Sequence, residues 1–465
     1  MRLKPNLLDL PNEILLIILE NLDDDKQALA AIACLSKRTR RLAYLLLYNT
    51  LSSSALASVS RNFIIDGELP AVSYLKNVVV DNFEFPYVFG EDYIRKHLRT
   101  IFSNIDRNER TICRHPPMSK LCLRSFSLPL YSTLTQGVPS VLQHLKELEL
   151  RTPFPHHEIQ LCISLYIQMY SNNLTRLTID FVGVTSIPDY NTISKLLQPL
   201  PQLSSRLQSL RLNLGISQPY RPTEVLQELF DNETFTFTLL NEFYFETTDK
   251  IFRLQTFLLR HPQIQALGYR IICSEVLVQP ENTIIDDLTV PGILPNIREF
   301  TGSLVNALLL SNKESQKRPL KRVRVHCGYI TSRAGVLQRQ LRALKTANNI
   351  QELYLTSSFR GHNLLDITTI VLACPQLTHF GCLLSPSQPT EEYLNHIYFV
   401  ILRNLLQLEY LELFVNHLDD TSLVQQHTDA IARAAVLNER LLTLPLDIEV
   451  RSNFTPTPLV QFRYG

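Results

Sequence analysis

Apolar residues recur at helical spacing through the first fifty residues of the chain, in three segments separated by Asp23-Asp24-Asp25 and by the residues before Ser36. Their apolar positions are Ile14, Ile17, Ile18 and Leu22, then Leu29, Ile32, Ala33 and Leu35, then Leu42, Leu45, Leu46 and Tyr48. Residues three or four positions apart share one side of a helix, so we predict three short helices over residues 9–51. Pro11 suits the first turn of the first helix, and the aspartates and Ser36 suit the starts of the second and third.

The first of these helices is apolar nearly all round, because residues 14–19 form an unbroken apolar run. Such a helix needs cover on more than one side. A unit of about forty residues buries too little surface to supply that cover alone. We therefore expect a partner, or the rest of the chain, to cover it.

A different pattern begins near Leu75, where six-residue pieces of the form L-x-x-L-x-L return along the chain. They start at Leu75, Met118, Leu145, Leu174, Leu207, Leu240, Ile264, Ile297, Leu320, Ile350, Leu377, Leu408 and, less clearly, Leu441. The alternation of apolar residues predicts a strand in each piece. After the first gap the starts lie about 23 to 33 residues apart, which is the spacing of a repeat built from a strand and a helix.

Several gaps between the pieces carry apolar residues at helical spacing, namely residues 158–170, 248–259, 336–344, 391–406 and 423–437. A strand, a loop and a helix repeated many times predict an α/β fold with a parallel sheet. Each unit would bury its apolar face against its neighbours, as in a solenoid whose sheet is concave and whose helices are convex. Some other α/β layering is the alternative.

Within each piece positions four and six face the core, so positions three, five and seven face outward on the strand side. Arginine and tyrosine are prominent at these outward positions, and both residue types anchor protein interfaces. We therefore predict a protein-binding face rather than a small-molecule pocket. The candidate contacts are Arg151, Arg176, Arg211, Tyr244, Arg322, Arg324, Tyr354 and Tyr410. The alternative is that any solenoid exposes such residues.

Composition narrows the possible partners and compartments. A chain of 465 residues that is 45% hydrophobic can bury a large core, and its net charge of +1 argues against a strong overall attraction to nucleic acid or an anionic membrane. Its eight cysteines lie scattered, without zinc-ribbon or CxxC spacing. We therefore expect reduced thiols, no metal, no cofactor and a cytoplasmic or nuclear protein. No secretory signal or membrane-length apolar run is found, so no membrane span is expected.

The sequence offers little material for catalysis, since the motifs GxGxxG, GxxxxGK[ST], GxSxG and HExxH are all missing. His156-His157-Glu158 is the tightest group of metal-capable residues, but adjacent helical residues diverge by about 100°, which favours an ordinary helix start. A basic cluster comprises Lys313, Lys317, Arg318, Lys321, Arg322 and Arg324. It could be a nuclear-import or nucleic-acid patch, but the lack of interleaved aromatic residues favours a solvated loop that leads into a strand.

The N-terminal stretch resembles the F-box family. The resemblance is carried by Leu10-Pro11-x-Glu13-Ile14, Ile17-Ile18-x-x-x-Leu22, Leu29, Leu35-Ser36-Lys37, Arg40-Arg41 and Leu47-Tyr48. Thr39 and Tyr48 stand where many F-boxes carry tryptophan, and Leu35 stands where valine is usual. The later pieces resemble irregular leucine-rich repeats, and Cys374-Pro375-Gln376-Leu377 is similar to the opening of such a repeat. We therefore expect an F-box at residues 5–51, a linker or first helix at 52–74 and a leucine-rich-repeat solenoid at 75–465.

The resemblance implies a non-catalytic receptor subunit of an SCF-type cullin–RING ubiquitin ligase. In that family the F-box docks onto the Skp adaptor and the rest of the chain selects a protein substrate. By the same resemblance the adaptor contacts would be Leu10, Pro11, Ile14, Ile17, Leu29, Leu35 and Ser36. The main alternative is a non-ligase protein-binding scaffold whose N-terminal helices only cap the solenoid. A third, less favoured alternative is an unrecognised enzyme with a loop-lined cleft.

Overall fold

The computed structural model describes residues 10–22, 25–47, 50–51, 75–81, 96–101, 103, 118–124, 142–151, 170–180, 190–214, 224–247, 253–271, 288, 290–311, 318–325, 349–355, 363–385, 390–415, 421–436, 446–452 and 458–464. Its internal contacts divide the chain into two compact units. Unit 1 comprises Met1–Ser217 and Glu224–Leu239, and unit 2 comprises Gln218–Thr223 and Leu240–Gly465. The expected linker at 52–74, the expected helix at 336–344, all but the last residue of the expected helix at 158–170, and His156-His157-Glu158 lie outside the described residues.

The N-terminal part of unit 1 contains the helices α1 (Asn12–Glu20), α2 (Lys26–Ala33) and α3 (Lys37–Leu47). Pro11 precedes α1, and its carbonyl oxygen accepts the first hydrogen bond of the helix, from the N–H of Leu15 at 3.0 Å. The carboxylate of Asp25 caps α2 by accepting the N–H of Ala28 at 2.9 Å. The hydroxyl of Ser36 accepts the N–H of Thr39 at 3.0 Å. The helix starts predicted at the aspartates and at Ser36 are therefore confirmed.

The rest of unit 1 contains strands that pair in parallel in chain order. They are β1 (Thr50–Leu51), β2 (Asn77–Asp81), β3 (Lys120–Arg124), β4 (Glu147–Arg151), β5 (Arg176–Asp180) and β6 (Ser209–Leu214). The helices in this part of the unit are α9 (Tyr190–Leu197), α10 (Leu200–Leu203) and α11 (Glu224–Asp231). Parallel pairing requires a crossover between consecutive strands, and these helices belong to such crossovers.

Unit 2 continues the same arrangement. Its parallel strands are β7 (Glu242–Thr247), β8 (Ala266–Ile271), β9 (Glu299–Gly302), β10 (Arg322–Val325), β11 (Glu352–Leu355), β12 (His379–Leu383), β13 (Tyr410–Val415) and β14 (Leu446–Ser452). The last strand, β15 (Pro458–Tyr464), runs antiparallel to β14. The helices are α12 (Gln255–Arg260), α13 (Leu304–Ser311), α15 (Leu364–Ala373), α16 (Glu391–Asn404) and α17 (Thr421–Val436).

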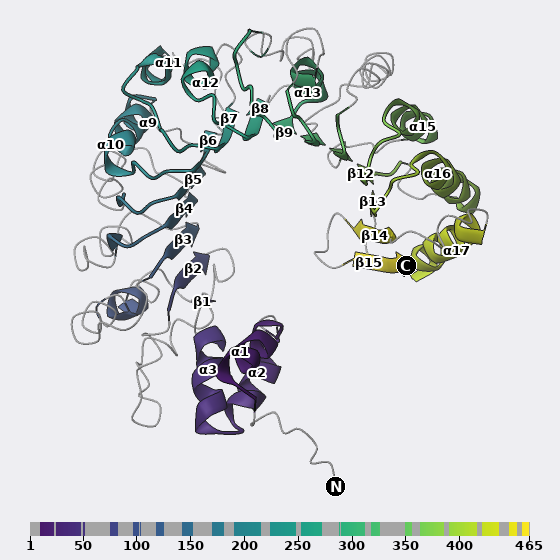
Figure 1. Ribbon diagram of the computed structural model, residues 1–465, viewed down its shortest axis with the longest axis horizontal. Helices are drawn as coiled ribbons and strands as arrows, with labels where there is room; N and C mark the ends of the chain where they lie inside the picture. The colour runs from purple at the N-terminus through teal and green to yellow at the C-terminus, as the bar shows by residue number, and fades with distance from the viewer. Residues whose placement is uncertain are drawn as a thin grey trace. The chain divides into compact units, whose positions relative to one another are not determined.

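Each unit has two layers, because buried and partly exposed residues alternate along its strands. In β7, for example, Phe243 and Phe245 are buried while Glu242, Tyr244 and Glu246 are partly exposed. Figure 1 shows that α9 to α11 lie on one side of the strands of unit 1, and that α12, α13 and α15 to α17 lie on one side of the strands of unit 2. The core lies between strands and helices. We call the opposite surface of the strands, which carries no helix in the described part of the chain, the helix-free face.

Two backbone hydrogen-bond patterns recur from strand to strand. A tight turn precedes many of the L-x-x-L-x-L pieces, as where the N–H of Leu174 donates to the carbonyl of Ser171 at 3.0 Å. The same turn ends at Leu145, Leu207, Ile264, Ile297, Leu377 and Leu408. In addition, one carbonyl of each piece accepts two N–H groups of the next, as where Lys146 accepts from Thr175 at 2.8 Å and Arg176 at 2.9 Å. Consecutive strands are thus held in the same register.

The predicted mixed α/β fold with a mostly parallel sheet is confirmed. Each strand from β2 to β13 begins at the third residue of its predicted piece. The piece from Leu441 was misplaced, since it overlaps β14 only at Leu446; β14 alternates Leu446, Ile448 and Val450 without the L-x-x-L spacing. The helices predicted at 391–406 and 423–437 appear as α16 and α17, and the helix predicted at 248–259 overlaps α12. The helices α9, α10, α11, α13 and α15 were not predicted.

Candidate protein-binding surfaces

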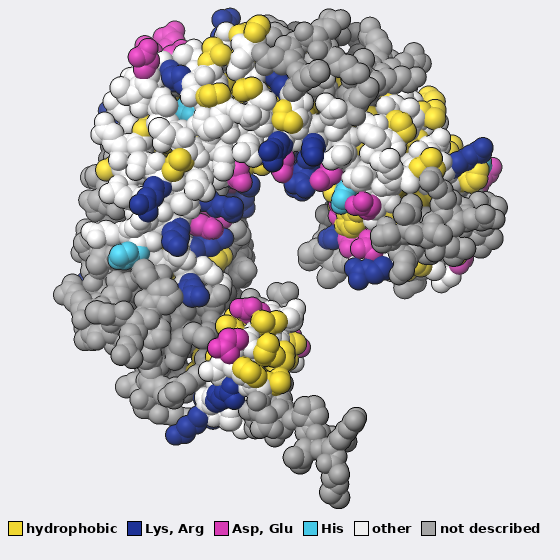
Figure 2. Space-filling model, in the orientation of Figure 1, with side chains coloured by type: hydrophobic (Ala, Val, Ile, Leu, Met, Phe, Trp, Pro, Cys, Tyr) yellow, Lys and Arg dark blue, Asp and Glu magenta, His cyan; other side chains and the backbone are white. Residues whose placement is uncertain are grey.

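The N-terminal helices bury one set of apolar residues and expose another. The buried set is Leu15 and Leu19 of α1, Leu29 and Ala33 of α2, and Ala43 of α3. On the other side of α1, Ile14 is 44% exposed and Ile17 is 55% exposed, and Leu35 between α2 and α3 is 57% exposed. Pro11 is exposed and Leu10 is half-buried. Figure 2 shows hydrophobic side chains gathered on these helices. Large apolar side chains left in water on so small a unit mark an interaction surface.

Two of the predicted adaptor contacts have roles inside the helical unit. Leu29 is fully buried, so it packs against the other helices rather than facing a partner. Ser36 is half-buried, and its hydroxyl bonds to the Thr39 hydroxyl at 3.0 Å as well as to the N–H of Thr39. The side chain of Thr39 accepts the N–H of Ser36 in return, at 3.1 Å. Thr39, which stands where many F-boxes carry tryptophan, is thus buried with its hydroxyl satisfied.

Arg38 ties the start of α1 to α3. Its Nη2 donates to the carbonyl of Leu10 at 2.5 Å, and its Nε donates to Oδ1 of Asn12 at 2.6 Å. The two acceptors flank Pro11. The guanidinium therefore fixes the chain segment that carries the first predicted contacts, at the N-terminal end of the exposed apolar surface.

On the helix-free face of unit 1, the predicted contacts Arg151, Arg176 and Arg211 are exposed. Nε of Arg151 forms an ion pair with Oδ2 of Asp180 at 2.8 Å, across the neighbouring strands β4 and β5. The side chain of Asp180 is only 6% exposed, so this pair is partly shielded from water. The three arginines come from three consecutive strands, and the register places Arg211 directly beside Thr178 rather than beside Arg176.

In unit 2, Arg322 bridges two carboxylates on the strands that flank it. Its Nη1 lies 2.8 Å from Oε1 of Glu299 on β9. Its Nε and Nη2 lie 2.5 Å and 2.9 Å from the two carboxylate oxygens of Glu352 on β11. The hydrogen bonds to Glu352, with the charges of both carboxylates, raise the pKa of Arg322 above its usual range. Arg322 thus forms a bidentate ion pair with Glu352, and bidentate arginine–carboxylate pairs are stronger than pairs with a single hydrogen bond.

Arg324, two residues further along β10, stacks on a ring instead. Its guanidinium carbon lies 5.3 Å from the ring centroid of Tyr354 on β11, a cation–π distance. Tyr354 in turn lies against Gly381 on β12, where an added Cβ would come within 2.5 Å of the ring. Tyr244 on β7 lies against Gly268 on β8 in the same way. Both predicted tyrosines are thus half-buried and held on the strand surface by a glycine of the next strand.

Tyr410 belongs to a hydrogen-bonded cluster at the C-terminal strands. Its hydroxyl donates to Oε2 of Glu449 at 2.9 Å, and its ring centroid lies 5.8 Å from that of His379. Arg451 pairs with Glu412 at 2.9 Å and with Glu449 at 2.5 Å. Burial and the Glu449 hydrogen bond raise the pKa of Tyr410, so the phenol stays protonated. The polar groups of this cluster largely satisfy one another.

Several residues of these surfaces were missed by sequence reasoning. Gly268 and Gly381 occupy position five of their pieces, and the signal would have been a tyrosine at position five of the preceding piece. Asp447, Glu449 and Arg451 lie on β14, whose pairing with β13 places its piece four residues after the predicted start at Leu441. Asp447 pairs with Arg463 of β15 at 2.9 Å.

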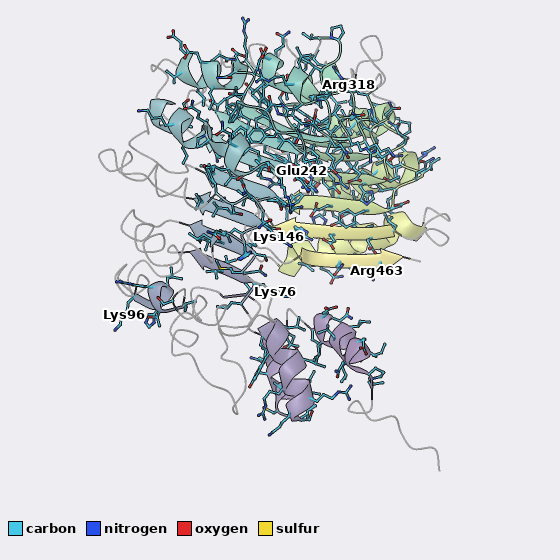
Figure 3. The ribbon with its side chains drawn as sticks, turned by 60° about the vertical axis from the view of Figure 1, so that its left-hand side comes forward. Lys76, Lys96, Lys146, Glu242, Arg318 and Arg463 are labelled. Atoms are coloured by element: carbon cyan, nitrogen blue, oxygen red, sulfur yellow. The ribbon has the colours of Figure 1, made fainter. Side chains whose placement is uncertain are left out.

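The described members of the basic cluster do not form one patch. Arg318 is only 3% exposed and donates to the carbonyls of Ile293 at 3.1 Å and Leu288 at 2.9 Å. Figure 3 labels Arg318 well apart from Arg463, which lies on β15. Lys321 is exposed, whereas Arg322 and Arg324 make the contacts above. Lys313 and Lys317 lie outside the described residues.

The described residues were also searched for metal sites and membrane spans. They contain no group of three or more His, Cys, Asp or Glu side chains that could hold a metal ion. Cys34, Cys122, Cys374 and Cys382 form no disulfide, and burial raises the pKa of Cys374 to about 12, which leaves that thiol unreactive. None of the helices in this part of the chain is both long and apolar enough to cross a bilayer.

Comparison with known families gives one match. Residues 7–47, which include α1, α2 and α3, match the F-box family, described as the F-box domain. A comparison with curated proteins finds no relative. F-box domains generally bind the Skp adaptor and through it cullin–RING ligases, and F-box proteins are typically non-catalytic. The chain thus carries an N-terminal F-box domain, which supports a role in substrate recognition by an SCF-type ubiquitin ligase.

Proposed function

We propose that this chain is the substrate-recognition subunit of an SCF-type ubiquitin ligase. Its F-box, residues 5–51, binds the Skp adaptor, and its repeat region, residues 75–465, binds a protein substrate, with residues 52–74 between them. The observation that carries the proposal is the match of residues 7–47 to the F-box domain, joined to a long run of parallel strands. Ubiquitin transfer then belongs to the partner subunits, and this chain positions the substrate.

The exposed apolar surface of the F-box supports adaptor binding. Pro11, Ile14, Ile17 and Leu35 present apolar groups to water. At about 25 cal/mol per Å² of apolar surface, covering half of an isoleucine or leucine side chain gains roughly 1 kcal/mol. Together these residues supply the driving force for docking. Leu10 joins them at the rim, whereas Leu29 and Ser36 contribute by fixing the helices that present the surface.

The recurring backbone contacts support a leucine-rich-repeat solenoid. The tight turn before the first apolar residue, and the carbonyl that accepts two N–H groups from the next piece, return at the same places in successive pieces. Each piece contributes one parallel strand whose apolar residues point to the helix side. A structure that repeats its hydrogen bonds along with its sequence is built from one supersecondary unit.

We assign substrate binding to the helix-free faces. In unit 1 the predicted arginines reach this face from the consecutive strands β4 to β6, and in unit 2 Arg322, Arg324 and Tyr354 reach it from the paired strands β10 and β11. A polypeptide lying across the strands would therefore meet several of them. Arginine and tyrosine at the centre of an interface contribute most to binding energy. In both units this face is polar, with arginine and tyrosine side chains beside carboxylates, as protein-binding surfaces commonly are.

Binding of the purified Skp adaptor to the full chain tests the proposal. The informative variant is Ile17→Glu, which places a charge in the exposed apolar surface of α1. The matched control is Leu365→Glu on α15, where an apolar side chain is 63% exposed in unit 2. We expect Ile17→Glu to weaken adaptor binding about thirtyfold or more, since a buried unpaired charge costs at least 2 kcal/mol. The Leu10→Ala, Pro11→Ala double variant should weaken it similarly, and Leu365→Glu should bind like the wild type.

A wild-type chain that is folded yet does not bind the adaptor would refute the proposal. The chain would then be a protein-binding scaffold whose N-terminal helices serve another purpose. Equal losses in Ile17→Glu and Leu365→Glu, with both variants folded as judged by circular dichroism, would refute the assignment of the adaptor surface, because a charge outside that surface would then weaken binding as much as one inside it.

A further inference from the structure

Arg324 differs from its neighbours on the helix-free face of unit 2. Arg322, Arg451 and Arg463 each form an ion pair with a carboxylate at 2.5–2.9 Å. Arg324 is exposed, and among the arginines whose side chains are described on this face it is the one without a carboxylate within ion-pair distance. An exposed guanidinium keeps its five N–H donors available for a partner.

The position of Arg324 is fixed before any partner arrives. Its guanidinium stacks on Tyr354, whose ring is itself held against Gly381, so three consecutive strands hold the side chain. A free arginine loses rotamer freedom on binding, and a stacked one has already lost much of it. Arg324 is therefore preorganised to bind, with an aromatic surface directly beside it.

The described carboxylates near Arg324 are each paired with another arginine. Glu299 and Glu352 bind Arg322, which lies on the same strand and face. Glu412 is the carboxylate whose field reaches Arg324, but Arg451 binds it at 2.9 Å. Among the described residues, Arg324 therefore has no carboxylate partner of its own.

We propose that Arg324 and Tyr354 form the anchor of the substrate-binding face of unit 2, and that the anchor takes an Asp or Glu side chain of the substrate polypeptide. The guanidinium fork matches a carboxylate with two parallel hydrogen bonds, and Tyr354 packs against the substrate residue beside it. A carboxylate fits better than a phosphate group. Phosphate recognition uses clusters of arginines, whereas Arg322 is occupied by Glu299 and Glu352. These carboxylates also repel a doubly charged phosphate group more strongly than a singly charged carboxylate. The inference deepens the proposed function and rests on it.

Selection of displayed random 12-residue peptides on the full chain tests this inference. The wild type, Arg324→Glu and Arg298→Glu are used in parallel. Arg298 is exposed just before β9 and takes no part in the stack, so its variant matches the charge change. We expect peptides selected on the wild type and on Arg298→Glu to share a position enriched in Asp or Glu. On Arg324→Glu that position should instead be enriched in Lys or Arg.

A synthetic peptide of the selected sequence then separates the ligand chemistries. Changing its acidic residue to the amide should weaken binding to the wild type about tenfold, because a charge-assisted pair is lost. The same change should have little effect on binding to Arg324→Gln, a second variant that avoids a new charge. A phosphoserine peptide that binds more tightly than the carboxylate peptide would overturn the choice of a carboxylate.

The inference fails if the wild type selects no peptides, if selected peptides share no acidic position, or if Arg324→Glu keeps the same acidic preference. Adaptor binding is measured on the same preparations. Adaptor binding without an acidic preference would refute this inference alone, whereas an acidic preference without adaptor binding would refute the ligase proposal alone.

Discussion

The ring of Tyr354 on β11 lies against Gly381, its in-register neighbour on β12, so closely that a Cβ at position 381 would come within 2.5 Å of ring atom Cδ1. Tyr244 and Gly268 repeat the arrangement on β7 and β8. At these two positions the absence of a side chain is a packing requirement. In both places the tyrosine ring lies in the space that a side chain of the next strand would otherwise fill.

We predict that Gly381→Ala destabilises the chain by about 1–3 kcal/mol, the usual cost of overpacking. The added methyl group must push the Tyr354 ring off the strand surface, which also removes the support of Arg324. Urea unfolding of the full chain measures the loss. In a Tyr354→Ala background the same Gly381→Ala change should cost little, because the ring it collides with is gone. An equal cost in both backgrounds would mean that strand flexibility, rather than the ring contact, explains the effect.

Arg322 should matter more to stability than the exposed ion pairs do. Its removal leaves Glu299 and Glu352 close together without the cation between them, and the side chain of Glu352 is only 20% exposed. We expect Arg322→Gln to cost about 1–3 kcal/mol, most at low salt, since screening weakens the repulsion. Arg433→Gln is the control, because its pair with Glu391 is about half exposed on both sides and should be worth less than about 1 kcal/mol. A loss in Arg322→Gln that does not depend on salt would contradict this account.

Two buried histidines make stability depend on pH. Burial lowers the pKa of His261 and of His427 to about 4. His261 Nδ1 lies 2.6 Å from the carbonyl of Phe257, and His427 Nδ1 lies 2.8 Å from the hydroxyl of Tyr398. The unfolded chain takes up these protons near pH 6.5, so acid favours unfolding. The stabilisation is complete above pH 6.5 and is lost as the pH falls towards 4.

Between pH 7 and pH 5 we expect each of these histidines to cost the folded state about 2 kcal/mol, from 1.36 kcal/mol per pH unit. Unfolding by urea across this range measures the slope. His427→Gln should reduce the pH-dependent loss by about 2 kcal/mol. His396→Gln, on the exposed side of α16, should leave the loss unchanged. A slope that is the same in His427→Gln as in the wild type would show that His427 takes up its proton in the folded chain as well.

Local sequence was sufficient to predict the strands but not the arrangement of their outward side chains. A pattern of alternating apolar residues only six residues long is enough to predict a strand, so the positions of β2 to β13 could be predicted from the sequence. The helices α9, α11, α13 and α15 were not predicted. They lie in segments between the six-residue pieces, and these segments vary too much in length for a repeating pattern to show where a helix begins and ends. α13 and α15 are apolar over most of their length, so periodicity gives little signal.

The surfaces depend on contacts between repeats that single pieces do not contain. Arg322 and Arg324 look equivalent in the sequence KRVRV, yet one sits between two carboxylates and the other on a ring. The difference comes from Glu299, Glu352 and Tyr354 on neighbouring strands, and it can be seen only once the register is known. Arg318, four residues earlier, looked like a member of the same basic cluster but is buried.

Arg318 should stabilise the loop that precedes β9. Its guanidinium joins the carbonyls of Ile293 and Leu288 in the loop before β9, where Gly292 and Leu294 have positive φ angles of 87° and 50°. Arg318→Met keeps most of the apolar stem and leaves both carbonyls without this donor, so we expect a loss of about 2–4 kcal/mol in urea unfolding. Lys321→Met, at an exposed site three residues on, should change stability by less than about 0.5 kcal/mol. Equal stability of Arg318→Met and the wild type would show that other groups satisfy this loop.

Arg38 should control adaptor affinity without contacting the core. Its hydrogen bonds to the Leu10 carbonyl and the Asn12 side chain hold the segment around Pro11 in place. Removing them lets that segment sample other conformations, so adaptor binding must then order it again. Two charge-assisted hydrogen bonds at an exposed site are worth about 1–2 kcal/mol together, so Arg38→Ala should weaken binding about fivefold to thirtyfold. Calorimetry with the purified adaptor measures this change.

The control for Arg38 must match its charge, because the loss of any cation on α3 could alter the attraction of the two proteins. Lys37→Ala removes a neighbouring exposed cation that makes neither hydrogen bond, and we expect it to bind the adaptor within about twofold of the wild type. Arg38→Lys keeps the charge but not the planar fork, so it should bind like Arg38→Ala. If Arg38→Lys binds like the wild type, charge rather than the position of Leu10 and Pro11 is what Arg38 contributes. If the thermal unfolding temperature of Arg38→Ala falls together with its affinity for the adaptor, the hydrogen bonds of Arg38 stabilise the whole F-box rather than only the segment around Pro11.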